Sequence, residues 1–125
     1  QVFLCAPTDD VKSELLKSDV FGFPSAFEGF PLALTEAKSA GLPAVGFRAS
    51  PAVNEIIRDG IDGFLADDVD DFAEKLRILM KSPELRAKFG AAGKKDCEQY
   101  APKIVWDQWE ALLRRVVEER AKRRA

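Results

Sequence analysis

Four short apolar runs alternate with stretches of helical character, and this alternation constrains the fold more than any other feature of the chain. The runs cover residues 2–6, 19–25, 44–48 and 61–66. Short strands that alternate with helices through brief connections are typical of a parallel sheet with helices on both faces. We therefore predict an α/β fold, a partial Rossmann-like domain whose parallel sheet is flanked by helices.

The part of the chain after residue 66 carries helix signals alone. Apolar residues recur at helical spacing over 69–80 and again over 105–116. Ser82-Pro83 combines a helix cap with a proline at the first helical position, as Ser50-Pro51 does earlier in the chain. The aspartates of 67–71 favour a helix start through the helix dipole. We predict a helical C-terminal tail behind the last strand.

Composition narrows the function classes. The 125 residues suffice for one domain, and a net charge of −2 gives no sequence-wide field that would attract nucleic acid. The two cysteines, Cys5 and Cys97, are expected to be reduced in a cytoplasmic protein. The absence of histidine removes the commonest general base and the commonest metal ligand from this chain. The chain begins at Gln1, with no methionine before it, and its first residues already form an apolar run. We therefore expect a piece of a longer protein.

The loop after the second apolar run is where a ligand is expected, because doubly wound sheets bind ligands beyond the carboxyl ends of their strands. Gly29 carries no side chain and lets the backbone approach a ligand closely. Pro31 suits the first position of the helix that follows. The amides of Phe30, Leu32 and Ala33 would then be free at the helix end, which is an arrangement that binds phosphate.

Two glutamates lie on either side of this helix start. Glu36, just over one turn into the helix, can accept two hydrogen bonds from a ribose diol, and Glu28 can accept from other hydroxyls. A pyrophosphate between two sugars would satisfy the amides and both carboxylates together, so the residues indicate a nucleotide-sugar site. The plainer alternatives are that Glu36 is a solvated helix residue and that Glu28-Gly29 is only a turn.

The ordered motif PSAFEGFPLALTEAKSAGLPAV (24–45), followed by NEIIRDGIDGFL (54–65), resembles the C-terminal half of retaining, GT-B-type glycosyltransferases of family four, the glycosyl transferases group 1. The E-x7-E pair of that family corresponds to Glu28 and Glu36. The resemblance implies that residues 1–125 are the C-terminal portion of a donor-binding domain. It also implies that the N-terminal acceptor domain and the start of this domain lie outside the chain.

The resemblance assigns roles residue by residue. It makes Glu28 the catalytic-site residue, in contact with hydroxyls of the transferred sugar near the reacting carbon, and it places Glu36 on the ribose of the donor. The remaining donor-binding residues are Gly29, Phe30, Pro31 and Leu32 around the sugar and the β-phosphate, and Leu4 and Cys5 against the base. Cys5 stands where the family usually has glycine. Ala49-Ser50-Pro51 stands where the family often has a pair of glycines. The resemblance implies that this loop faces the donor sugar, so the change affects the expected sugar preference.

The implied reaction transfers a sugar, with a UDP-hexose donor favoured, to a glycan or lipid-linked acceptor with retention of configuration. No cofactor is expected, and phosphate recognition is expected to need no metal ion, because the aspartates of 67–71 are expected to start a helix. An Arg/Lys pair and an active-site histidine come from parts of the enzyme outside this chain, so the chain alone is expected to bind donor weakly and transfer nothing. A peripheral association of the full enzyme with the inner face of the membrane is an open alternative to a purely cytoplasmic location.

Other functions are weighed against this one. A GT-B-type epimerase or a glycogen-synthase-like enzyme would keep the fold and change the chemistry. A non-catalytic α/β interaction domain, such as a phosphoacceptor receiver, would use Asp9-Asp10, but Pro24-Ser25 and Phe47-Arg48 occupy its other key positions. In intact GT-B enzymes the last helix crosses to the N-terminal domain. Trp106 and Trp109 could pack there, and for Trp109 we favour a place in the local core.

Overall fold

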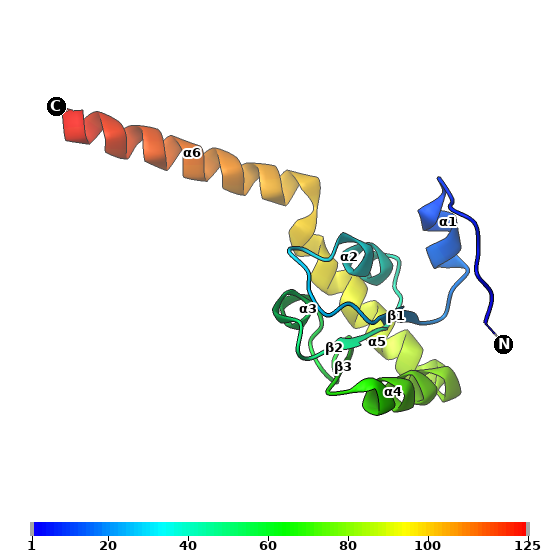
Figure 1. Cartoon of the computed structure of the whole chain (residues 1–125). Coiled ribbons are helices and arrows are strands. Elements are labelled where there is room, and N and C mark those ends of the chain that lie inside the picture. Colours follow the sequence, from blue (N-terminus) through cyan, green and yellow to red (C-terminus); the bar gives the residue numbers. More distant parts are fainter. Residues whose placement is uncertain (1, 125) are drawn as a thin grey trace.

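A three-stranded parallel sheet forms the centre of the computed structural model, which describes residues 2–124 (Figure 1). Its strands are β1 (Phe21–Phe23), β2 (Ala44–Phe47) and β3 (Gly63–Ala66), in the order β1-β2-β3. In the register, Ala44 of β2 lies between Phe21 and Gly63. The predicted parallel sheet with flanking helices and a helical tail is confirmed.

Within residues 2–124, six α-helices and one short 3₁₀ helix surround and extend this sheet. They are α1 (Val11–Leu16), α2 (Leu32–Ser39), α3 (Pro51–Ile56), α4 (Val69–Lys81), α5 (Pro83–Asp96), η1 (Cys97–Tyr100) and α6 (Pro102–Arg124). The predicted cap at the start of α5 is present, because Ser82 accepts from the amide of Leu85. At the start of α4, Asp68 is the cap and accepts from the amide of Asp71. The aspartates at 67–71 therefore serve the helix start, as predicted.

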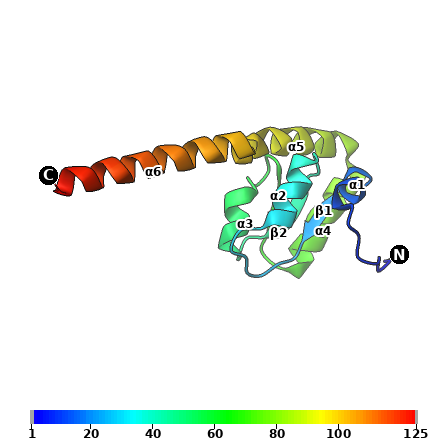
Figure 2. The same cartoon turned by 90° about the horizontal axis from the view of Figure 1, so that it is seen from above.

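The core divides into two clusters because successive strand residues point to opposite faces of the sheet. Ala44 belongs to the cluster that packs against α2 and α3, whereas Val45 belongs to the cluster that packs against α4 and α5. The helices therefore cover both faces of the sheet: Figure 1 shows α2 and α3 on one side of the strands and α4 on the other, and Figure 2 shows the same elements from above. The first cluster is Leu34, Ala44, Val53, Ile56, Ile57 and Leu65, and the second is Val45, Ala66, Leu79 and Phe89.

Glycines allow α5 to lie directly on the end of α2. Gly41 follows α2 with a φ of +87°, a left-handed conformation that glycine adopts without steric cost. A Cβ added at Gly90 of α5 would lie only 2.1 Å from the carbonyl oxygen of Gly41. The close approach places the C-terminal half of α5 beside α2, the helix that carries Glu36.

The predicted strand at 2–6 is wrong. Residues 2–6 form no strand in the structure, and Leu4 is 99% exposed. Apolar composition favours a strand only when a neighbouring backbone pairs with it and a core covers its side chains, and this segment packs into neither core cluster. The second predicted strand is also shorter, because Pro24 cannot donate to a ladder.

Helix α6 leaves the domain after its first turn and runs outward as a single rod (Figure 1). Trp106 is 71% exposed and Trp109 is 53% exposed. The prediction that Trp109 completes the local core is therefore wrong, because the helix has already left the domain at that position. Among residues 2–124, no helix combines the length and the apolar composition that crossing a bilayer requires.

Candidate donor site at the start of helix α2

The loop between β1 and α2 ends in a tight turn centred on Pro31. The amide of Leu32 donates to the carbonyl oxygen of Phe30 at 2.9 Å, and Pro31 has φ −80° and ψ 80°, close to an inverse γ-turn. Pro31 is therefore the N-cap residue and not the first helical residue as predicted. Its carbonyl accepts the amide of Thr35 at 3.0 Å and the hydroxyl of Thr35 at 3.1 Å.

This turn changes which amides can meet an anion. The amide of Leu32 is predicted to be free, but its bond to Phe30 already uses it. Ala33 and Leu34 occupy the second and third helical positions, where an amide has no acceptor within its own helix. The first turn of α2 contains no acidic side chain, so the positive end of the helix dipole is not offset by the helix itself. The helix end is chemically suited to an anion, through Ala33 and Leu34.

The two glutamates lie on accessible sides of this helix start. Glu28 is half-buried in the loop after β1, and Glu36 is exposed on α2. Glu36 lines a cavity of about 440 Å³ between α1 and α2 and a second cavity of about 610 Å³ between α2 and the start of α6. On the opposite side of α2, Leu34, Ala37 and Lys38 are buried. The helix therefore presents Glu36 outward while its other face joins the core.

The remaining predicted site residues fall into two groups. Gly29 is open, since a Cβ added there would meet no atom within 4 Å, and Phe30 is about half exposed. Both lie in the loop with Glu28, next to the N-terminus of α2. Leu4 and Cys5 lie in exposed chain before α1 and belong to no strand or helix. Their contact with a base stays a prediction.

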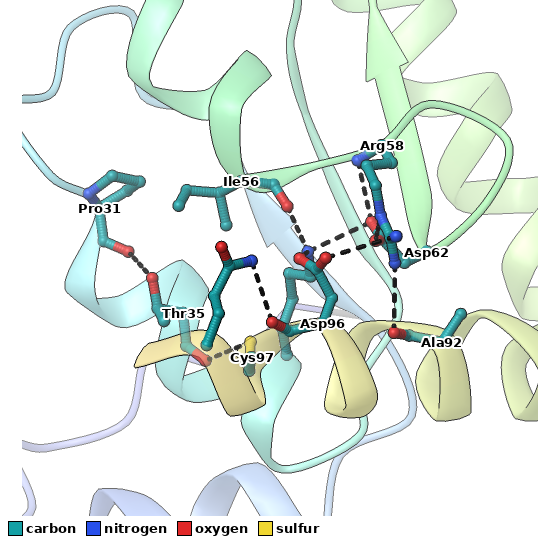
Figure 3. Close-up of polar contacts among 10 residues, drawn as sticks. Pro31, Thr35, Ile56, Arg58, Asp62, Ala92, Asp96 and Cys97 are labelled. Carbon is teal, nitrogen blue, oxygen red and sulfur yellow. Dashed lines mark hydrogen bonds and ion pairs between the residues drawn. The ribbon is translucent and has the colours of Figure 1, made fainter. Parts of the chain in front are cut away.

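Behind α2 lies a cluster of charged side chains, centred on the buried Lys38, that sequence reasoning missed. The side chain of Lys38 is completely buried, and its ammonium lies 3.3 Å from the carboxylates of both Asp62 and Asp96. It also donates to the carbonyl of Ile56 at the end of α3. Arg58 completes the cluster, 2.6 Å from Asp62 and 3.4 Å from Asp96. Figure 3 shows Ile56, Arg58, Asp62 and Asp96 converging from separate elements.

The cluster is electrically balanced, with two cations and two carboxylates. Its hydrogen bond to Asp62 raises the pKa of Arg58, so the guanidinium stays charged. A buried lysine is tolerated only when such partners satisfy it. The sequence does hold a signal for Lys38: it lies four residues after Leu34, in the row of α2 that faces the core. The partners Asp62 and Asp96 lie too far along the chain for any local pattern to reveal.

Residues that a phosphoacceptor receiver would use make local structural contacts here. Asp10 caps α1 by accepting the amide of Ser13 at 3.1 Å, and the hydrogen bonds from Ser13 lower its pKa. Arg48, directly after β2, is paired with Asp59 at 2.6 Å and with Asp67 at 2.8 Å. The strand end that would need an acidic residue holds Pro24-Ser25, and at the later strand end the cation of Arg48 is held by these two carboxylates, so Asp10 and Arg48 serve local structure.

Comparison with known proteins identifies the family. Residues 1–96 match the family described as glycosyl transferases group 1. The chain belongs to this family. The resemblance read from the E-x7-E motif is thereby confirmed, and the motif falls within the matched residues.

This chain corresponds to only part of the length of each relative. The amylovoran biosynthesis glycosyltransferase AmsD of Erwinia amylovora is 30% identical over 112 residues, which are 88% of this chain and 31% of AmsD. The UDP-Gal:alpha-D-GlcNAc-diphosphoundecaprenol alpha-1,3-galactosyltransferase of Escherichia coli is 40% identical over 70 residues, which are 54% of this chain and 18% of that enzyme. The chain therefore spans less than a third of either relative.

A solved structure supports the fold of the site. The pneumococcal O-GlcNAc transferase GtfA, in complex with UDP and GlcNAc, is similar with a TM-score of 0.72 and 26% sequence identity. The similarity covers 86% of this chain and 23% of GtfA. The sheet and helices that hold Glu28 and Glu36 here thus belong to an arrangement found in a glycosyltransferase.

Proposed function

We propose that this chain is the donor-binding portion of a retaining glycosyltransferase that takes a nucleoside-diphosphate sugar, with a UDP-hexose favoured. One observation carries the proposal: Glu28 and Glu36 lie on either side of an uncompensated helix N-terminus that follows a parallel strand. In sheets of this kind that position is where ligands bind. Two acceptors around an anion-binding end match a ligand with hydroxyls on both sides of a diphosphate.

The donor would lie along the start of α2. The amides of Ala33 and Leu34 would donate to the diphosphate, and the helix dipole would add to this attraction. The carboxylate of Glu36 would accept from the ribose diol, and Glu28 would accept from hydroxyls of the transferred sugar. Gly29 would allow the backbone to approach that sugar. The base would lie toward Leu4 and Cys5.

The chain's share of catalysis would be electrostatic. Negative charge grows on the diphosphate as the bond to the sugar breaks, and donors fixed at the helix end stabilise that charge without having to reorient. The acceptor, a glycan or a lipid-linked sugar, would be held by the part of the enzyme beyond this chain. We therefore propose that the isolated chain binds donor weakly, requires no metal ion, and transfers nothing.

The named relatives support the choice of substrates. The Escherichia coli relative is named for a UDP-galactose donor and a lipid-linked acceptor, and the pneumococcal structure holds UDP and GlcNAc. The name of the Erwinia relative places it in the biosynthesis of amylovoran. These names support a UDP-sugar donor and an acceptor in glycan assembly. We place the full enzyme in the cytoplasm or at the inner face of the membrane as part of the same proposal.

Calorimetric titration of the chain with UDP, GDP and ADP, without added metal, tests the proposal. We expect saturable binding of one diphosphate, UDP first, and a loss of about tenfold or more in Glu36→Ala, because a hydrogen bond to a charged group contributes about 1.5–3 kcal/mol. Glu84→Ala is the matched control, since Glu84 is an exposed glutamate in the first turn of α5. Equal binding by Glu36→Ala and Glu84→Ala would refute the assignment of Glu36.

A further inference from the structure

The segment Asp96–Tyr100 contacts the loop and helix that carry both glutamates at three successive points. Asp96 lies 3.3 Å from the ammonium of Lys38, and the thiol of Cys97 donates to the carbonyl of Thr35 at 3.7 Å. The ring of Tyr100 packs edge-to-face on Phe30, with ring centroids 5.6 Å apart. The two segments run in opposite directions, so these contacts extend from the C-terminal half of α2 back to the loop before it.

The contact between Asp96 and Lys38 fixes the orientation of α2. Lys38 and Glu36 are two residues apart, so they point to opposite sides of the helix, one into the buried charges and the other outward. Because the ammonium of Lys38 reaches the α3 carbonyl, Asp62 and Asp96 at once, a rotation of α2 would break several buried contacts together. The direction in which Glu36 points is therefore determined from the far side of its helix.

The contact between Tyr100 and Phe30 fixes the loop between β1 and α2. Phe30 lies between Glu28 and the start of α2, and its contact with Tyr100 ties this part of the loop to η1. Tyr100 itself packs against the core cluster formed by Leu34, Val53 and their neighbours. The loop thus rests on an anchored ring. Between these two contacts, burial raises the pKa of the Cys97 thiol, which keeps it protonated as a donor to Thr35.

We propose that Asp96–Tyr100 is a positioning clamp for the donor site, with Tyr100 and Asp96 acting through Phe30 and Lys38 to hold Glu28 and Glu36 in place. The inference rests on the proposed function for its ligand and on the contacts above for its geometry. Tyr100 lines the cavity beside Glu36, and in this proposal it acts on the donor through Phe30, as Asp96 acts through Lys38. Their effect is to reduce the reorganisation that the loop and α2 would otherwise undergo when a diphosphate sugar binds.

The test compares Tyr100→Leu, which removes the aromatic contact, with Tyr100→Phe, which keeps the ring. Hydrogen exchange of the hydrogen-bonded amides of Leu32 and Thr35 reports on the loop, and the amides of β2 report on global stability. In Tyr100→Leu, we expect exchange at Leu32 and Thr35 to rise relative to β2 by about three- to tenfold, which is the scale of one aromatic pair. Tyr100→Phe should restore the original ratio.

Titration with UDP supplies the functional readout. We expect the Kd of Tyr100→Leu for UDP to rise by about tenfold. This is a smaller effect than the roughly 100-fold loss of rate that a catalytic group misplaced by 1 Å can cause. Tyr100→Phe should bind like the unchanged chain, and Lys103→Ala, on an 85% exposed side chain next to the clamp, is the matched control.

The outcomes separate this inference from the proposed function. If exchange at Leu32 and Thr35 follows β2 in every variant, the clamp does not exist, whatever UDP does. If exchange responds as expected while UDP fails to bind the unchanged chain, the clamp stands as a structural contact and the proposed function is wrong. A weaker affinity in Tyr100→Leu without a local change in exchange would also overturn the clamp.

Discussion

At the scale of single residues, Lys38 shows how a charge can be buried in a small domain. Its ammonium makes one hydrogen bond to a backbone carbonyl and two close contacts with carboxylates, and Arg58 shares those carboxylates. Replacing such a group by an apolar one leaves partners buried and uncompensated, which costs more than the original pair contributed. The residue therefore has a large effect on stability although it lies outside the donor site.

We predict that Lys38→Met lowers the free energy of unfolding by about 3–5 kcal/mol, the range found when one partner of a buried ion pair is removed. Lys17→Met is the control, because Lys17 pairs with Glu14 at 3.0 Å but is 69% exposed, where such pairs contribute about 0–1 kcal/mol. Urea unfolding followed by circular dichroism measures both. Equal losses in the two variants would show that the cluster is not buried in solution.

At the scale of elements, the packing of α5 on the end of α2 depends on a missing side chain. An alanine in a helix is normally favoured over glycine by about 1 kcal/mol. At Gly90, however, the added Cβ would lie 2.1 Å from a backbone oxygen that has no rotamer to change. The steric cost exceeds the gain in helix propensity, so the helix must move away from α2.

Gly90→Ala is therefore predicted to lower stability by about 1–3 kcal/mol, as overpacking does. In Gly22→Ala, the added Cβ would meet its nearest neighbour at 3.6 Å, an ordinary contact, so this variant should stay within about 1 kcal/mol of the unchanged chain. Thermal unfolding of both variants checks the pair. A Gly90→Ala variant as stable as Gly22→Ala would mean that α5 does not approach Gly41 this closely.

The elements also show what sequence reasoning can reach. Caps such as Ser82 are local, so the sequence predicts them well. The tight turn at Pro31, which uses the amide of Leu32, depends on a ψ value that proline does not dictate. Residues 2–6 could form a strand only beside a pairing strand, which the structure does not supply. Asp96 contacts Lys38, which lies 58 residues away in the sequence. Contacts between distant segments leave no local pattern to read.

At the scale of the whole molecule, the chain consists of a domain and a projecting rod. The domain buries its apolar residues on both faces of the sheet. Helix α6, which projects from the domain (Figure 1), exposes a row of large apolar side chains. The row is Trp106, Trp109, Leu112, Leu113, Val116 and Val117. A contiguous apolar surface of this kind is unusual on a soluble monomer and is typical of an interaction surface.

Both tryptophans lie in this row, so their fluorescence reports directly on whether α6 is covered. At low concentration, we predict that acrylamide quenches Trp106 and Trp109 nearly as strongly as it quenches free tryptophan, because both side chains are more than half exposed. As the concentration rises, self-association through the row should reduce quenching, and sedimentation velocity should show larger species. Replacing Leu113 and Val117 by serine should move that transition to higher concentration, since the apolar area available for burial falls. A monomer at every concentration, with both tryptophans shielded from acrylamide, would mean that α6 folds back onto its own domain in solution and does not project from it.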